Sequence, residues 1–259
     1  TQIDGVGVVT AAITDTVSGG LTLTAVTANT PFTVSGIGVN RSAASSLNFT
    51  GDKVLVLPDR LGPDSFGMNV TGTLTVVNLP TFAGDVITLS AGKDLVVVTP
   101  ISVGGGMVTL TAGKGLTLGD KVTANTLNLT AGTVGQKHDV SITTAVQNLA
   151  VDMKGTGDFT VIQTGALNLG SLNMSGGNLT IVADGDITIN SLTGTIGAIS
   201  ITSKTGKINI INNTALAGAV MLSAASGSIA VAMIEADTLD ITAGGSVSLV
   251  EKDDVVVDS

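Results

Sequence analysis

The sequence lacks the residues on which several classes of protein depend. Among its 259 residues there is no cysteine, no tryptophan and no tyrosine, and only two arginines, two glutamates and one histidine. The absence of cysteine excludes disulfide scaffolds and thiolate zinc sites. Glu, Gln and Arg, which usually fill helix surfaces, are scarce, whereas Thr, Val, Ile and Leu are abundant. The composition therefore predicts an all-β fold.

The acidic balance and the scarcity of aromatic residues limit the partners of the chain. The formal net charge is -9, and phenylalanine supplies all of the 2% aromatic residues. Such a chain is poorly suited to bind nucleic acid or to insert into or adhere to an anionic membrane. With 43% hydrophobic and only 12% charged residues, it can still bury a large core, which excludes disorder.

A unit of about 20 residues recurs from residue 86 onward. Each unit has two segments of alternating apolar and polar residues, joined by a corner of Ser, Thr, Ala or Gly. Alternation with period two places the apolar side chains on one face of a strand. A single unit cannot bury such a face by itself, so we expect consecutive units to stack as turns of a parallel β-solenoid.

Stacking predicts the architecture and its divisions. About a dozen turns fit in the chain, with equivalent residues in columns about 4.8 Å apart. Residues 84–259 are expected to form regular turns, and residues 1–83 less regular turns with a loop insertion at 58–67. The uncharged run Ala215–Ile234 has the length of a membrane-spanning helix. Its serine-containing corner and its repeat register favour solenoid strands instead.

Two short fragments and one histidine are the candidates for a metal site. The fragments Gly155–Phe159 and Ala183–Ile187 resemble parts of the Gly/Asp motif that binds calcium in repeat proteins. That motif recurs in tandem about every nine residues, which these fragments do not, so bound calcium is the less favoured alternative. His138 stands without the other residues of a metal site or a catalytic triad. We predict no catalytic, cofactor-binding or metal-binding residue, and no cofactor.

Two further motifs match without their full context. Ala91–Lys93 and Ala112–Lys114 resemble the end of a phosphate-binding loop, but its first glycine and its Ser or Thr after the lysine are missing, so both are interpreted as corners. Glycosylation sequons arise wherever Asn and Thr share the outward side of a strand. They begin at Asn48, Asn69, Asn128, Asn173 and Asn178.

The repeat resembles those of a known group of bacterial surface proteins. Its pattern Leu/Ile/Val-x-Leu-Thr-Ala-Gly-x-x-Leu-x-Leu, seen at 87–97, 108–118 and 239–249, is similar to filamentous-haemagglutinin-like adhesins and large autotransporter passengers. The resemblance covers roughly residues 84–250. It implies a right-handed parallel β-helix that is exported to the cell surface or secreted. No binding residues carry over, and the Asn-Pro-Asn-Gly signature of two-partner secretion is missing.

Two functions from different classes remain. The first is a non-catalytic structural or adhesive rod of an extracellular fibre, with an unknown host or matrix ligand. The second is a carbohydrate-active β-helix enzyme, a polysaccharide lyase or hydrolase. Such an enzyme needs paired carboxylates, or a base with a cation. The scattered Asp residues and the lack of aromatic faces favour the rod.

The two ends of the sequence bear on assembly. Residues 1–10 lack the basic start and continuous apolar core of a signal peptide. Neither end has an amphipathic helix that could cap a solenoid, and Glu251–Asp258 is a charged corner followed by a strand-forming valine run. We therefore expect either that the chain is cut from a longer solenoid or that copies associate through their end strands.

Overall fold

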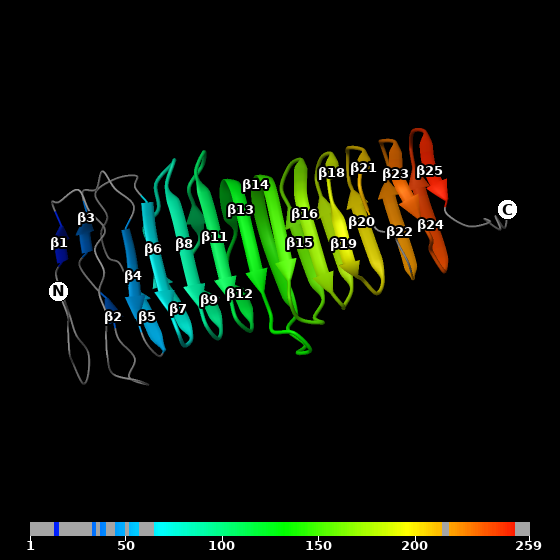
Figure 1. Ribbon diagram of the computed structural model, residues 1–259. Helices are drawn as coiled ribbons and strands as arrows, with labels where there is room; N and C mark the ends of the chain where they lie inside the picture. Colours follow the sequence, from blue (N-terminus) through cyan, green and yellow to red (C-terminus); the bar gives the residue numbers. More distant parts are fainter. Residues whose placement is uncertain are drawn as a thin grey trace. The chain divides into compact units, whose positions relative to one another are not determined.

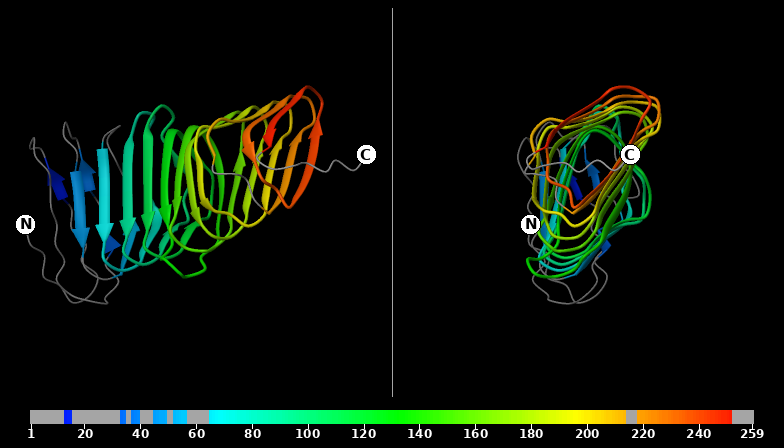
Figure 2. Two further views of the ribbon diagram at one scale, coloured as in Figure 1. Left: turned by 45° about the vertical axis from the view of Figure 1, so that its right-hand side comes forward. Right: turned by 90° about the vertical axis from the view of Figure 1, so that its right-hand side faces the viewer.

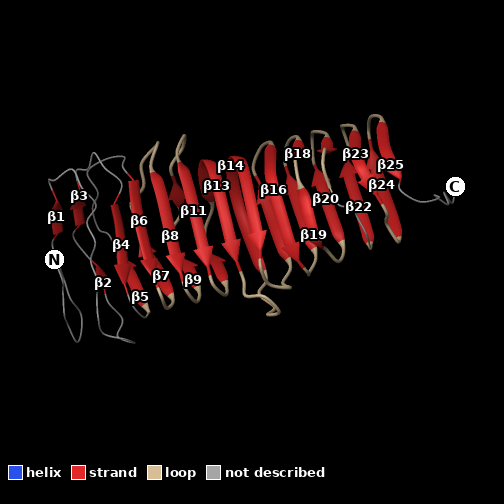
Figure 3. Cartoon of the chain, viewed as in Figure 1, coloured by secondary structure: helices blue, strands red, loops and turns tan. Residues whose placement is uncertain are grey.

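The structure is a computed structural model that describes residues 13–15, 33–34, 37–39, 45–49, 52–56, 65–213 and 218–251. These residues form strands and turns and contain no helix (Figure 3), which confirms the predicted all-β class. The chain divides into two compact units, Thr1–Gly132 and Thr133–Ser259. This division falls between Leu127 and Val140, where the repeat step shortens to 13 positions.

The first unit consists of short strands rich in Val, Ile, Leu and Thr, the residues that favour a pleated and half-buried backbone. Its described strands are β1 (Ile13–Asp15), β2 (Thr33–Val34), β3 (Ile37–Val39), β4 (Ser45–Phe49), β5 (Lys53–Val56), β6 (Ser65–Val70), β7 (Leu74–Asn78), β8 (Val86–Ala91), β9 (Leu95–Val97), β10 (Ile101–Ser102), β11 (Met107–Ala112), β12 (Leu116–Leu118) and β13 (Val122–Ala131).

The second unit has the same composition of strands. They are β14 (Val140–Met153), β15 (Phe159–Gln163), β16 (Leu167–Ser175), β17 (Leu179–Ala183), β18 (Ile187–Ile189), β19 (Leu192–Thr195), β20 (Ile199–Ser203), β21 (Ile208–Ile210), β22 (Ala219–Ala224), β23 (Ile229–Ile234), β24 (Thr238–Ala243) and β25 (Val247–Glu251).

The strands of the first unit pair in parallel and build two ladders (Figure 1). One ladder runs β4–β6–β8–β11–β13, and the other runs β2–β5–β7–β9–β12. Strand β10 pairs with the start of β13, and β1 pairs with β3. Each turn contributes one strand to each ladder, so the hydrogen-bonded neighbours of a strand belong to the turns before and after it.

The second unit repeats this arrangement with two long ladders and a short third one, β14–β16–β19. The first is β14–β15–β17–β20–β22–β24, and the second is β14–β16–β18–β21–β23–β25. Strand β14 belongs to both ladders because it runs for 14 residues without a corner. Both views in Figure 2 show the chain of this unit, coloured green to red, passing from one ladder to the other turn after turn.

These ladders are the turns of a β-solenoid, as the sequence predicts. The structure has about nine turns of about 21 residues. The expected dozen turns of about 20 residues refer to the whole chain, including residues 1–64, of which the structure describes only short segments. The right-handed winding implied by the resemblance stays a prediction.

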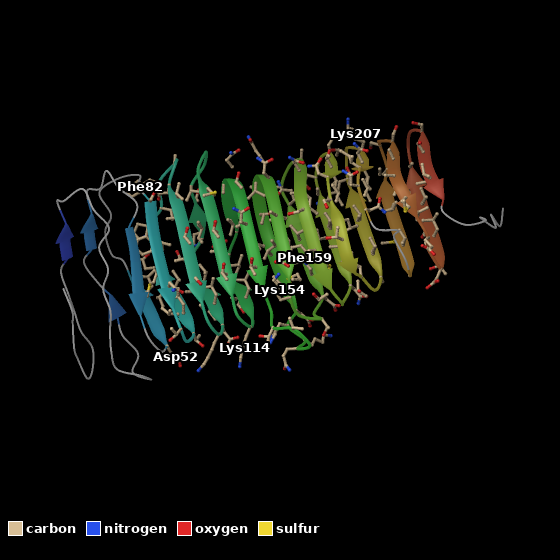
Figure 4. All side chains as sticks on the ribbon, in the orientation of Figure 1. Asp52, Phe82, Lys114, Lys154, Phe159 and Lys207 are labelled. Atoms are coloured by element: carbon tan, nitrogen blue, oxygen red, sulfur yellow. The ribbon has the colours of Figure 1, made fainter. Side chains whose placement is uncertain are left out.

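The alternating apolar residues form columns inside each unit, which confirms their predicted inward direction. In the first unit Ile87 pairs with Val108, and Val108 pairs with Leu127. All three side chains are fully buried. In the second unit Phe159, labelled in Figure 4, is among the largest fully buried side chains. Each turn thus covers the apolar face of the next, and burial of this surface drives the stacking.

Glycines at the corners allow consecutive turns to approach closely. At Gly177 the backbone φ is 80°, in the left-handed region that favours glycine. A Cβ atom at this position would lie 2.1 Å from the carbonyl oxygen of Gly157 in the preceding turn. The N–H of Gly197 in turn donates to the carbonyl oxygen of Gly177 at 2.7 Å. A side chain here would separate the turns and break this contact.

The outcomes of three segment predictions differ. Residues 58–64 of the expected loop lie outside the described residues, while Ser65–Gly67 begin strand β6. The change in regularity at residue 83 stays a prediction for the same reason. Much of the uncharged run 215–234 forms strands β22 and β23. Within the part of the chain that the structure describes, no helix is long and apolar enough to cross a membrane.

Candidate functional site

The described residues bring together no group of three or more His, Asp or Glu side chains that could hold a metal ion. His138 is half-buried in the loop before β14. The next residue, Asp139, has its Oδ1 3.7 Å from the Nζ of Lys137. His138 is thus flanked in the sequence by one carboxylate, Asp139, and by one lysine, Lys137, and the two charged side chains lie close to each other.

The second calcium-like fragment, Ala183–Ile187, forms a corner between β17 and β18. Its Asp184 Oδ1 accepts a hydrogen bond from the Nζ of Lys204 in the next turn at 2.8 Å. This hydrogen bond, and then the positive charge of Lys204, hold the pKa of Asp184 below its ordinary value. Asp186 Oδ1 accepts the backbone N–H of Lys207 at 2.9 Å. Both carboxylates therefore join consecutive turns.

The first calcium-like fragment contributes to a column of Asp and Asn side chains at the other corner of the second unit. The N–H of Asp158 donates to Asp139 Oδ1 at 2.9 Å, and the N–H of Asn178 donates to Asp158 Oδ1 at 2.8 Å. One turn further, the N–H of Ala198 donates to Asn178 Oδ1 at 2.8 Å. Each side-chain oxygen supplies a partner for a corner N–H of the following turn. We call Asp139, Asp158 and Asn178 the Asx column.

The first unit uses the same arrangement at the corner before its second ladder. Asp52 Oδ1 accepts the N–H of Thr73 at 2.7 Å, and Asp94 Oδ1 accepts the N–H of Gly115 at 3.0 Å. In sequence order, Asp52, Thr73, Asp94 and Gly115 follow one another at intervals of 21 positions. Figure 4 shows Asp52 and Lys114 at the same edge of this unit.

The two sequences that resemble a phosphate-binding loop lie at this same corner, as expected. The N–H of Lys114 donates to the carbonyl oxygen of Lys93 in the preceding turn at 2.9 Å. The Nζ of Lys93 is 3.9 Å from Asp52 Oδ1, and both side chains are about half exposed. These lysines therefore belong to turns of the solenoid and not to a strand that leads into a helix.

Asparagine side chains connect turns on the outward side of the second unit. The Nδ2 of Asn168 donates to Asn148 Oδ1 at 2.8 Å, and the Nδ2 of Asn190 donates to Asn168 Oδ1 at 2.6 Å. The sequon residue Asn173 donates through Nδ2 to Asp152 Oδ1 at 3.0 Å. Ladders of this kind stabilise stacked parallel strands. The sequon asparagines Asn173 and Asn178 both bond to neighbouring turns.

The buried polar residue Gln163 is the least expected feature of the second unit. It lies at the inward position that Ala183 occupies one turn later, and it is 2% exposed. Its Oε1 accepts from Thr144 Oγ1 at 2.7 Å and from the N–H of Val146 at 3.3 Å. Its Nε2 donates to the carbonyl oxygen of Val146 at 2.7 Å and to that of Ala166 at 2.9 Å.

The local pairing explains why an amide is needed at this position. Three residues of β14 separate Thr144 from Asn148, whereas four residues separate their partners Gln163 and Asn168. The straight strand β14 therefore lies beside a corner of the next turn. The amide of Gln163 takes the place of a peptide group there and satisfies both backbone groups of Val146, which would be costly to bury unpaired.

No family model, no curated protein and no solved structure matches this chain. Its function must therefore be inferred from its own residues. Residue types alone indicated scattered Asp residues and did not reveal the Asx column. The signal that could have found it is the spacing of Asp139, Asp158 and Asn178, which are 19 and 20 positions apart, in step with the repeat.

Proposed function

We propose that this chain is a non-catalytic structural or adhesive β-solenoid of a bacterial extracellular or cell-surface fibre. The observation that supports this proposal is the use of corner carboxylates and amides to join turns. A general acid or a nucleophile must be able to exchange a proton or a bond with substrate. The Oδ1 atoms of Asp139 and Asp158 instead accept backbone N–H groups of the next turn.

The proposed surface location and fibre role are based on the repeat pattern. The segments 87–97 and 108–118 resemble filamentous-haemagglutinin-like adhesins and autotransporter passengers, which suggests a secreted or surface location. A stack in which each turn contacts only its neighbours can be lengthened by repetition without a new core. That property suits a spacer or a fibre better than it suits an enzyme. The ligand of such a fibre would be a host or matrix molecule.

Immunogold electron microscopy of the cells that produce the protein tests its location and assembly. Antibodies raised against the purified chain should label extracellular fibres or the cell envelope. Labelling confined to the cytoplasm would contradict the proposal.

A second experiment tests the carbohydrate-active alternative. The purified chain is incubated with a panel of neutral and acidic polysaccharides, and the release of reducing ends and of unsaturated uronate products is followed. We expect no release. Turnover that is lost in Asp184→Asn but kept in the outward variant Thr202→Ala would establish the enzyme instead.

A further inference from the structure

The asparagines of the five glycosylation sequons differ in their surroundings. Three of them, Asn48, Asn69 and Asn128, lie inside strands β4, β6 and β13 of the first unit. Asn69 pairs with Ser90, and the Nδ2 of Asn128 lies 3.5 Å from the Oγ1 of Thr109. Paired positions in a parallel ladder are only about 4.8 Å apart. A sugar at Asn69 or Asn128 would therefore meet a side chain of the adjacent turn.

Asn173 of the second unit contacts the turns on both sides. It is half-buried within strand β16. Its Nδ2 donates to Asp152 Oδ1 in the preceding turn at 3.0 Å. Its Oδ1 accepts from the Oγ1 of Thr193 in the following turn at 3.4 Å. A sugar on this nitrogen would disturb the contact with Asp152.

Asn178 differs from the other four asparagines because it lies at a corner, directly before β17, and is exposed. Its Oδ1 accepts the N–H of Ala198 in the next turn at 2.8 Å. Among the residues that the structure describes, none accepts a hydrogen bond from the Nδ2 of Asn178. The amide is thus held through its oxygen, while its nitrogen is available to form a bond.

Small residues next to Asn178 leave room for a saccharide. Gly177 precedes it in the chain, and the next turn has Gly197 and Ala198 at the equivalent positions. In the preceding turn, Asp158 Oδ1 accepts the backbone N–H of Asn178 at 2.8 Å. None of these four neighbours carries a long side chain, so the space beside the amide is open to solvent.

The hydroxyl residue of the sequon is presented on the same side as the asparagine. Leu179 between them is buried, so Asn178 and Thr180 lie on the outward face of the chain. Residues two positions apart on one face of a strand are separated by about 6.6 Å. A glycosyltransferase can therefore approach the amide and the hydroxyl from one direction.

We propose that Asn178 is a modification site that carries an N-linked sugar. Its Nδ2 bonds to the anomeric carbon of a sugar activated as a diphosphate ester. The bond from that carbon to the diphosphate oxygen breaks, its electron pair leaves with the diphosphate, and a proton of Nδ2 passes to a base of the transferase. The Oδ1 atom takes no part and still accepts the N–H of Ala198, so the Asx column is kept. This inference goes beyond the proposed function and does not depend on it.

Mass spectrometry of the protein isolated from the cells that produce it tests the proposal. Asn173 and Asn178 share the tryptic peptide that ends at Lys204, and electron-transfer fragmentation distinguishes them. We expect a sugar on Asn178 and none on Asn173. Single hexoses would indicate a nucleotide-activated donor, and a preassembled oligosaccharide a lipid-linked donor. An unmodified Asn178, or a sugar on Asn173 in its place, would overturn the inference.

Matched variants at the sequon separate recognition from folding. Thr180→Ala removes the outward hydroxyl, and Thr180→Ser keeps it. We expect complete loss of the sugar in Thr180→Ala and its retention in Thr180→Ser, with the same circular dichroism spectrum for both. A sugar that persists on Asn178 in Thr180→Ala would overturn its assignment to the sequon.

The modification and the proposed function can fail separately. Extracellular fibres that are labelled by the antibodies but contain an unmodified Asn178 would overturn this inference alone. A glycosylated chain that is confined to the cytoplasm would overturn the proposed function alone.

Discussion

An interior column and the corner column beside it tolerate very different sets of residues in the second unit. The interior position carries four different side chains in four consecutive turns, all at most 2% exposed. The neighbouring corner carries glycine in every one of these turns. The two columns are Phe159–Leu179–Ile199–Val220 and Gly157–Gly177–Gly197–Gly218.

The difference shows which physical requirement each region imposes. An interior position needs apolar volume, and aliphatic and aromatic groups supply it with modest repacking. A corner position needs a particular backbone conformation and room for the carbonyl group of the adjacent turn. We therefore expect conservative changes to be mild inside the strands and severe at the corners, and charged changes to be severe inside.

The largest effect should come from Ile201→Asp, which tests the interior. Ile201 is fully buried between Ile181 and Leu222 of the adjacent turns. A carboxylate there would have no partner in the column, and we expect more than about 4 kcal/mol of destabilisation. The outward control Thr202→Ala should be near neutral. Equal melting temperatures of the two variants would refute the inward assignment of Ile201.

Gln163→Ala should have the next largest effect, because it removes the amide that completes a corner. The buried N–H and carbonyl groups of Val146 and the hydroxyl of Thr144 would lose this partner, at a cost of about 3 kcal/mol in unfolding free energy. Gln147→Ala, at an exposed position on β14, is the control and should change little. Chemical denaturation measures both, and a loss below that of the control would contradict the role of the amide.

Gly177→Ala tests the close approach of the turns. The added Cβ would meet the carbonyl oxygen of Gly157 at 2.1 Å in a left-handed backbone conformation, so we expect about 2 kcal/mol of destabilisation. Gly170→Ala is the matched control, since its nearest neighbour, the carbonyl oxygen of Leu149, is 3.7 Å from the added atom. If thermal melting ranks Gly170→Ala as the more damaging change, the distinction between corner and strand fails.

The smallest effect concerns the exposed pair Asp184–Lys204. Because the pKa of Asp184 is lowered in the folded state, the pair stabilises the fold above the ordinary Asp pKa of 3.8. This stabilisation is lost as the pH falls through the lowered value. The melting temperature of Asp184→Asn should thus lie slightly below that of the wild type at neutral pH and converge with it in acid. In a Lys204→Met background, the substitution at Asp184 should no longer show this pH dependence.

The inward-facing side chains could be predicted from the sequence because their direction depends on the local alternation of apolar and polar residues. Ile87, Val108 and Leu127 follow the repeat, and the structure places them in one column. Leu239 and Val247 also follow the repeat but remain exposed. Alternation thus gives the direction of a side chain, whereas its burial also depends on the packing of neighbouring turns.

The roles of the corner residues could be predicted only in part, because these roles depend on contacts between turns. Glycine content indicated tight corners, but which Asp or Asn oxygen accepts from which N–H depends on the register of two separate segments. Gln163 follows the inward alternation of Phe159 and Val161, yet nothing in its own strand explains an amide. The explanation lies in β14, which has one residue fewer between Thr144 and Asn148 than its neighbour has between Gln163 and Asn168.

The bonding of the candidate site residues was harder to predict from the sequence than the fold. His138 and the two calcium-like fragments were found by residue type, which does not reveal what each side chain bonds to. The structure places Asp158, Asp184 and Asp186 at corners where other turns supply their hydrogen-bond donors. Spacing in step with the repeat was therefore more informative than similarity to a short motif.

The carboxamide that substitutes for a peptide group at Val146 has a consequence for how tandem arrays change over time. Deleting a residue from one repeat normally shifts every later side chain to the opposite face of its strand. Here a glutamine satisfies the backbone groups beside the first mismatch, and a second register shift follows between Leu149 and Ala150, so the pairing ends in register at Met153 and Met174. Repeats of unequal length can then accumulate in one gene without loss of a continuous hydrophobic interior.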